Sequence, residues 1–471
     1  MQGGASWRPG SDGGTFVFTG TANQGTHNFI VPRGSVRFAE NAVVSSTGGA
    51  TSLGRDSSDG NRSANITIRD NAIMTLGVCS MGGGRKGGNV TVTLQNNAAL
   101  STGANNFDLH NVNRSTAVTT FRLNGGSLTV GGFTKTRTYA SAINFNGGWL
   151  KAGADNSAFL PALTEHTSLV QSGGAKIDDH GFAITMDSPL IHDSALGATA
   201  DGGLEKRGAG TLTLGGANSF TGPTKIFSGT LALSGSGSIA SGDLFVASGA
   251  AFDFSATGGN FALGSGRTLS GEGSIIGNFH LNSGAILDPG SNGIGRLTFN
   301  GSLTLGANST QYFEIQKTGS TNDSVAVSGG LTLNGTLNVT NLAGSLAVGD
   351  VFQLFTAGTF SGNFNAVNLP PLNAGLAWNT NQLAAAGTIR VVSVAPIRFS
   401  SVTAQNGDLT LSGSGGVPNG VYYLLTTTNL SLPLEEWLRL ETNAFNANGD
   451  FSTVLPMNSH TPGGFFKIQI P

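Results

Sequence analysis

The sharpest cluster of reactive side chains in this 471-residue sequence is formed by Asp178, Asp179 and His180. Two carboxylates beside an imidazole could bind calcium, or could act as acid and base on a glycosidic bond. The cluster lies in AKIDDHGFAITM, where a glycine separates two short alternating runs. Asp and Gly are ordinary turn residues, and catalysis needs several convergent groups. We therefore expect a turn whose three side chains face water, with no catalytic role. A polysaccharide lyase or glycoside hydrolase site at these residues is the weaker alternative.

Other reactive residues give no recognisable site pattern. Asp56 and Asp59 lack the spacing and the distal glutamate of a calcium loop, so we expect a polar loop. His166 and His192 each have an acidic neighbour, but adjacent strand residues point to opposite faces. The histidines show no zinc-ligand spacing, and no glycine-rich motif precedes a helix, so we expect neither a metal nor a cofactor. Cys79 lies in an apolar run and is expected to be a small core residue.

The composition points to a folded protein with many turns. Glycine accounts for 73 residues and apolar residues for 38%, whereas only 11% are charged and the net charge is −2. Collagen needs glycine at every third position, and disorder needs few apolar residues with a high net charge. Neither condition holds. Exposed positions must be mostly Thr, Ser and Asn, and such a neutral surface is a poor electrostatic match for nucleic acid.

Short alternating strands separated by Gly or Asn recur along most of the chain. In TLTL, Leu212 and Leu214 share one face, and nineteen residues later TLAL repeats the pattern with Leu231 and Leu233. Strands this short, at intervals of about 19 to 31 residues, suit a solenoid in which each coil stacks on the last. A single coil could not bury its leucines. The fold class we predict is all-β: a parallel β-helix over residues 15–395.

The segment 203–237 resembles the autotransporter-associated β-strand repeat, also called the passenger-associated transport repeat, of bacterial secreted and surface proteins. The resemblance rests on Lys206, on the sequence of residues 208–214 (GAGTLTL), on 220–222 (FTG) and on 229–233 (GTLAL). It implies a right-handed parallel β-helix that is exported and then displayed or released. Glu205, Lys206 and Arg207 match the charged lead-in of this repeat, and we expect them to form a solvated coil edge.

The sequence changes character after residue 395. Aromatics and prolines cluster there, and about six strands are expected to form a small antiparallel, β-sandwich-like module over residues 396–471. At the other end, residues 1–14 lack the basic and apolar regions of a signal peptide, so we expect an extension or the start of a fragment. No run of 18 apolar residues predicts a transmembrane helix.

These features together favour an extracellular or cell-surface structural or adhesive solenoid, and no enzyme. Its neutral polar face would bind cell surfaces or glycans. Two alternatives stay open. A carbohydrate-active β-helix enzyme would need three or more charged residues converging on one groove. A fibre similar to a phage tail spike would need an obligate trimer. Neither the ligand nor the oligomeric state follows from the sequence.

Limited proteolysis tests the expected boundary. We predict cleavage near residues 393–398 and two stable fragments, because the repeat pattern stops there and exposed linkers between folded units are the preferred sites of nicking. Mass spectrometry of the fragments identifies the cleaved bond. Protection of this segment, with cleavage elsewhere, would mean that the C-terminal module is an integral part of the solenoid.

Overall fold

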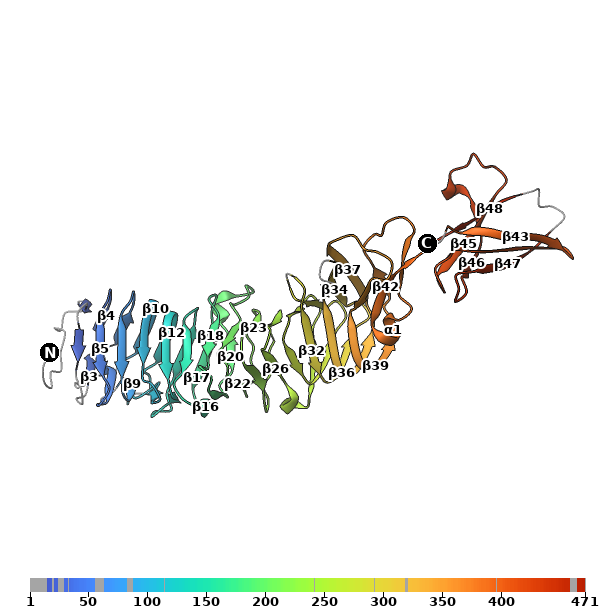
Figure 1. Cartoon of the computed structure of the whole chain (residues 1–471). Helices are drawn as coiled ribbons and strands as arrows, with labels where there is room; N and C mark the ends of the chain where they lie inside the picture. Colours follow the sequence, from blue (N-terminus) through green and yellow to red (C-terminus); the bar gives the residue numbers. More distant parts are fainter. Residues whose placement is uncertain are drawn as a thin grey trace.

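The computed structural model describes residues 15–18, 21–23, 29–32, 34–55, 63–82, 88–113, 115–240, 242–291, 293–317, 321–394, 396–457 and 464–470. The expected extension at 1–14 and the loop with Asp56 and Asp59 lie outside these residues. Figure 1 shows a long row of coils running from the N-terminal end, followed by a small group of strands near the C-terminus. In the described ranges, helix is limited to α1 (Leu383–Ala386) and to three 3₁₀ turns, Ser194–Leu196, Ser255–Thr257 and Leu434–Glu436.

The row of coils is the parallel β-solenoid that the sequence predicts, and it has about 12 turns. One long wall is a 22-stranded sheet. Its strands are β1 (Thr15–Phe18), β2 (Thr21–Asn23), β4 (Gly34–Phe38), β5 (Val43–Ser46), β7 (Ala64–Ile68), β8 (Ile73–Leu76), β10 (Val90–Ser101), β12 (Thr119–Val130), β14 (Ser141–Phe145), β15 (Trp149–Ala152), β17 (His166–Val170), β18 (Ala175–Asp178), β20 (Leu190–His192), β21 (Leu204–Arg207), β23 (Thr224–Ile226), β25 (Leu244–Val246), β28 (Thr268–Gly271), β31 (Ile286–Pro289), β34 (Thr310–Gln316), β35 (Thr321–Asn322), β37 (Thr336–Ala343) and β40 (Ala366–Asn368).

Two further parallel sheets complete the coils. The 5-stranded sheet contains β3 (Phe29–Pro32), β6 (Thr51–Arg55), β9 (Cys79–Met81), β11 (Asn106–Asp108) and β13 (Gly132–Thr134). The 12-stranded sheet contains β16 (Asn156–Leu160), β19 (Ala183–Met186), β22 (Thr211–Leu214), β24 (Thr230–Leu233), β26 (Ala251–Asp253), β27 (Asn260–Leu263), β29 (Ser274–Ile276), β30 (Asn278–Leu281), β32 (Arg296–Asn300), β33 (Leu303–Leu305), β36 (Ser324–Leu333) and β39 (Phe355–Gly362).

Successive coils stack with their strands in register. The two sequence repeats TLTL and TLAL lie on adjacent strands, where Leu212 pairs with Leu231 and Leu214 with Leu233. The interval between paired positions varies along the rod: Leu204 pairs with Thr224, twenty residues later, whereas Val90 pairs with Thr119. Coils of unequal length can stack because the extra residues leave the solenoid as loops between strands.

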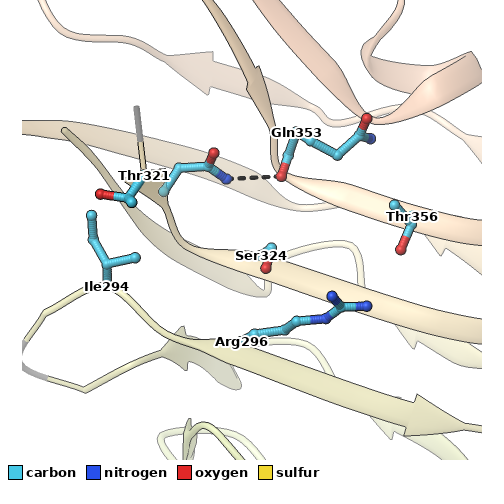
Figure 2. Close-up of a pocket in the computed structure, with 7 residues that line it drawn as sticks. Ile294, Arg296, Thr321, Ser324, Gln353 and Thr356 are labelled. Carbon is cyan, nitrogen blue, oxygen red and sulfur yellow. Dashed lines mark hydrogen bonds between the residues drawn. The ribbon is translucent and has the colours of Figure 1, made fainter. Parts of the chain in front are cut away.

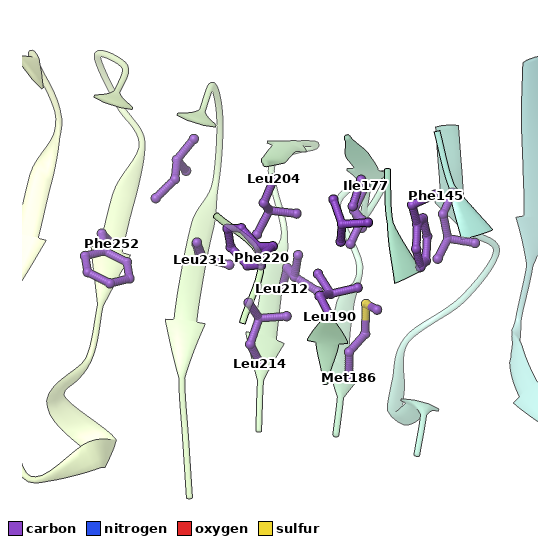
Figure 3. Packing of buried hydrophobic residues seen from close by; sticks show 14 of the residues in the cluster. Phe145, Ile177, Met186, Leu190, Leu204, Leu212, Leu214, Phe220, Leu231 and Phe252 are labelled. Carbon is purple, nitrogen blue, oxygen red and sulfur yellow. The ribbon is translucent and has the colours of Figure 1, made fainter. Parts of the chain in front are cut away.

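The core runs the length of the solenoid between these sheets. Figure 3 shows leucine, isoleucine, methionine and phenylalanine side chains from neighbouring coils meeting in one continuous row. Leu212, Leu231 and Phe252, on three consecutive strands of the 12-stranded sheet, are fully buried. Alternate residues such as Thr211 and Thr213 stay partly exposed, so each strand has the two faces that its alternation predicts.

The corners of the coils require unusual backbone. Glu40, Asp70 and Asn96 occupy equivalent turns with φ between 55° and 61°, the left-handed region. In the next coil the turn is one residue shorter, Gly126 takes φ 63° there, and a Cβ on it would lie 2.1 Å from the carbonyl oxygen of Ala98. Glycine is required at this corner because the coil below approaches too closely for any side chain.

Antiparallel strands follow the last coils. β38 (Val351–Gln353), β42 (Thr388–Ser393) and β41 (Leu376–Asn379) form a 3-stranded sheet beside the final rungs. Beyond it lies the small antiparallel β-domain, in which β43 (Arg398–Gln405), β44 (Asp408–Ser414) and β47 (Phe451–Pro456) form one sheet, and β46 (Leu438–Ala444), β45 (Val421–Thr427) and β48 (Phe465–Gln469) form another. Its separate core includes Leu411, Tyr422 and Phe451.

Candidate functional site

The Asp178–Asp179–His180 cluster divides between the surface and the interior. Asp178 ends β18, and its carboxylate accepts a hydrogen bond from the backbone N–H of His180 and lies 3.4 Å from the His180 ring. His180 occupies the turn with φ 53°, and its side chain is 43% exposed. Asp179 points the other way and is fully buried. The expectation that all three side chains face water was therefore wrong for Asp179.

Asp179 is buried because a cation from the next coil meets it. Lys206 Nζ lies 2.6 Å from Asp179 Oδ2, and both side chains are 0% exposed. The other carboxylate oxygen of Asp179 accepts hydrogen bonds from the N–H groups of Gly181 and Gly210, at 2.8 Å each. The prediction of a solvated coil edge at Glu205, Lys206 and Arg207 was wrong for Lys206. In sequence, the two partners are too far apart for their pairing to be evident before the register of the coils is known.

Lys206 also bonds to the coil that follows its own. Its ammonium donates to the carbonyl oxygens of Gly208 and Gly210 at 2.8 and 3.0 Å, and to that of Ser228 at 2.7 Å. Burial lowers the pKa of Lys206, and the Asp179 carboxylate opposes this by favouring the charged form. With one carboxylate and three carbonyls around it, the ammonium is fully satisfied. We call this arrangement the Lys206 staple, because it joins three consecutive coils.

The glycines of the repeat leave room for the staple. A Cβ at Gly208, where φ is 89°, would lie 2.1 Å from Asp179 Oδ1. A Cβ at Gly229 would lie 2.5 Å from Lys206 Nζ. The lysine and glycines of the motif are therefore parts of one buried structural unit. A cation held by so many fixed acceptors serves packing rather than proton transfer.

A second ion pair, between His192 and the buried Asp201, was missed by sequence reasoning. His192 Nδ1 lies 2.8 Å from Asp201 Oδ2 and 3.2 Å from the hydroxyl of Thr221. Asp201 also accepts backbone hydrogen bonds from Gly203, Thr221 and Gly222. The hydrogen bond that His192 makes to the Asp201 carboxylate raises the pKa of His192. A catalytic triad would place the hydroxyl and the carboxylate on opposite ring nitrogens. Here the hydroxyl and the carboxylate both contact Nδ1, and Nε2 lies near the carbonyl of Gly197. These contacts hold the loop between His192 and Asp201 in place.

Two carboxylates share a site near the C-terminal coils. Asp323 is fully buried and accepts hydrogen bonds from the N–H groups of Glu314 and Gly295, at 2.6 and 2.7 Å. Burial, together with the neighbouring Glu314 carboxyl, raises the pKa of Asp323 to about 8. Paired acids of this kind occur in the active sites of hydrolases, so a catalytic role for this pair depends on whether a substrate can reach it.

A surface hollow lies next to this pair but does not include it. The hollow has a volume of about 370 Å³ and is lined by Ile294, Arg296, Thr321, Asn322, Ser324, Gln353 and Thr356. Figure 2 shows these side chains around the opening, with the amide of Asn322 donating to the carbonyl of Gln353. Asn322 and Ser324 line it, whereas Asp323 between them points into the core. Arg296 is therefore the one charged residue in a lining that lacks an acid–base pair.

The remaining candidates are structural. Cys79 is buried, as predicted, and burial raises the pKa of its thiol. His166 lies between the hydroxyls of Ser141 and Ser168, at 2.9 and 3.2 Å. Burial, and to a smaller extent the Lys135 cation, lowers the pKa of His166 to about 4. Within the described parts of the chain, no three His, Cys, Asp or Glu side chains are grouped to hold a metal ion, and no helix is long and apolar enough to span a bilayer.

Comparison with known proteins places the Lys206 staple in a recurring sequence unit. The family model described as "passenger-associated-transport-repeat" matches residues 204–233, which include Lys206, Gly208, Gly210 and Gly229. Over 110 residues, 22% of the chain, the sequence is 36% identical to the adhesin BmaC autotransporter of Brucella suis biovar 1 (strain 1330). The matched part covers 3% of that relative. The predicted resemblance to the repeat family is confirmed.

The staple makes a measurable prediction about stability. Lys206→Met should lower the free energy of unfolding by about 3–5 kcal/mol, because it leaves the Asp179 carboxylate buried without its cation. Asp179→Ala should also destabilise, but the double variant should lose less than the sum of the two single losses. Urea unfolding followed by circular dichroism measures each value. Lys225→Met, at an exposed position on the next rung, is the matched control and should stay within about 0.5 kcal/mol. Strictly additive losses would contradict the pairing.

His166 makes a prediction about pH. Its pKa is lowered to about 4 in the folded protein, against an ordinary value of 6.5, so the unfolded chain binds more protons between these values. The contribution of the neutral His166 ring to the free energy of unfolding is fully present above pH 6.5. It is lost as the pH falls towards 4, and its size is on the order of 3 kcal/mol. Relative to His166→Gln, the native protein should therefore lose more stability on acidification. Parallel pH profiles of the two proteins would show that His166 does not contribute.

Proposed function

We propose that this protein is an extracellular structural or adhesive β-solenoid of the autotransporter-passenger type, secreted or displayed on a bacterial surface. The observation that carries the proposal is the similarity to an adhesin autotransporter, together with the match to a passenger-associated transport repeat. The chain spans a small part of that relative, so its adhesive role is transferred here as a proposal. We further propose that residues 396–471 form a separate module and that the solenoid is right-handed, the hand that parallel β-crossovers almost always take.

The proposed binding surface is polar and neutral over much of the rod. On the outer face of the 12-stranded sheet, Thr185 pairs with Thr213, and Thr211 pairs with Thr230, all partly exposed and uncharged. Rows of hydroxyls on a rigid β-face can make many hydrogen bonds to sugar hydroxyls without ordering cost, because the sheet already fixes their backbone positions. This supports contact with glycans or cell surfaces over a long flat area.

A carbohydrate-active enzyme is the second candidate, and the sites described above support it less well. Of the Asp178, Asp179 and His180 cluster, Asp179 is buried and neutralised by Lys206, whereas Asp178 and His180 pair with each other at the surface. Of the Asp323–Glu314 pair, Asp323 is fully buried and Glu314 is half-buried. We therefore propose a non-enzymatic role. A fibre similar to a phage tail spike would require three chains, and its test is the oligomeric state in solution.

A combined binding and turnover assay tests the proposed function. Beads coated with the full chain should adhere to epithelial cell layers and bind components of a glycan array, whereas beads coated with albumin should not. The same protein should release no reducing sugars from neutral or acidic polysaccharides, with or without calcium. Failure of the coated beads to adhere would overturn the adhesive proposal. Turnover abolished by Asp179→Ala or Asp323→Ala, in a variant that keeps its fold, would replace it with the enzyme alternative.

A further inference from the structure

Five neighbouring rungs of the 22-stranded sheet carry an unusual outer surface. On β15, β18, β21, β23 and β25 the outward positions form two columns in register. Every outward residue is charged or aromatic, in a chain with 11% charged and 8% aromatic residues. We call this surface the charged–aromatic band. One column is Trp149, Lys176, Glu205, Lys225 and Phe245. The other is Lys151, Asp178 and Arg207, and it is continued by Phe227, which directly follows β23 and whose ring contacts Arg207.

The side chains of the band hold one another in place. The Arg207 guanidinium lies between two aromatic rings, 5.1 Å from the centroid of Trp149 and 5.0 Å from that of Phe227. Lys176 lies 5.7 Å from the Trp149 ring, and Phe227 contacts Phe245 at 5.7 Å. Arg207 Nε also forms an ion pair with Glu205 at 2.8 Å. The side chains therefore lose little further freedom when a ligand arrives.

Much of this ordered surface remains accessible. The Arg207 side chain is 52% exposed. Phe227 is 37% exposed, whereas the largest aromatic rings of the solenoid core are fully buried. A phenylalanine kept partly in water forfeits hydrophobic stabilisation that an interior position would provide. Exposed aromatic residues beside arginine are the composition typical of binding hot spots.

The charge of the band differs from that of the rest of the chain. It holds four cationic side chains and two carboxylates, whereas the whole protein has a net charge of −2. A net positive surface attracts anions, and arginine is suited to planar carboxylate and sulfate groups. The partly exposed rings offer apolar faces that match the C–H faces of sugar rings. An acidic glycan supplies both features, whereas an acidic peptide supplies mainly the charge.

We propose that the charged–aromatic band is a binding site for an acidic polysaccharide, bearing carboxylate or sulfate groups, that lies along the solenoid axis. Four steps of about 4.8 Å between rungs give a band of roughly 19 Å, long enough for several consecutive sugars. The proposal rests on the adhesive function proposed above and gives that function a ligand class. In this arrangement the charged–aromatic band makes the main contact with the glycan, and the neutral threonine face of the 12-stranded sheet adds secondary contacts.

Binding of the full chain to defined polymers tests the band. The probes are immobilised heparin, hyaluronan, neutral dextran and poly-glutamate, measured by surface plasmon resonance. We expect binding to heparin and hyaluronan that weakens with added salt, and none to dextran. Lys176→Gln with Lys225→Gln should weaken binding about tenfold or more, and Phe227→Ser should weaken it comparably. Arg122→Ser, an exposed cation on β12 outside the band, is the matched control and should leave binding unchanged.

Several results would overturn the inference. The first is that neither heparin nor hyaluronan binds. The second is that the Lys176/Lys225 variant binds them as tightly as the native protein. The third is that poly-glutamate binds as tightly as the acidic glycans and that Phe227→Ser does not weaken this binding. The last result would assign the band to an acidic peptide. Thermal unfolding of each variant confirms that it folds; if Phe227→Ser does not, the Lys176/Lys225 variant still provides the test. Cell adhesion that survives the Lys176/Lys225 substitutions would refute the band and leave the adhesive function standing.

Discussion

Stacking of one coil on another is the interaction on which this protein depends. An isolated coil exposes the backbone N–H and C=O groups on both edges of its strands, together with a line of apolar side chains. It can neither pair those backbone groups nor bury those side chains by itself. In-register pairing, such as Leu212 with Leu231, satisfies both at once. Every other feature follows from the need to bring backbones within hydrogen-bonding distance at each rung. This need explains why glycine is required at the tightest corners, such as Gly126.

The close approach of the coils also determines how polar groups can be buried. Asp179, Asp201 and Asp323 are all buried, and all accept hydrogen bonds from backbone N–H groups of other segments. Corners of a solenoid leave such N–H groups without strand partners, and a carboxylate can satisfy two or three of them together. Acidic residues at the corners are therefore part of the backbone hydrogen-bond network, and they need not indicate chemistry.

The sequence predicts the parts of the structure that are local. Alternation in TLTL and TLAL indicates the strands and their buried faces, and the repeat motif indicates how these strands stack. The sequence does not predict which polar residues meet, because that depends on the length of every intervening loop. Asp179 and Lys206 pair through β18 and β21, and His192 meets Asp201 across a loop of its own coil. The outward columns of β15 to β25 are likewise visible only once the register is known. Cations and aromatics that appear scattered in sequence then form one surface.

The Lys206 staple has a mechanical consequence. In a simple solenoid each coil contacts only its neighbours, so tension along the rod can peel coils away one at a time. Lys206 bonds to the coil before its own through Asp179 and to the coil after it through Ser228. These three coils are expected to unfold together, because detaching either outer coil removes a hydrogen-bond or ion-pair partner from the buried Lys206 ammonium. A rod that is pulled between two surfaces would thus resist fraying at this segment, which holds β18, β21 and β23, the three central rungs of the charged–aromatic band, together under load.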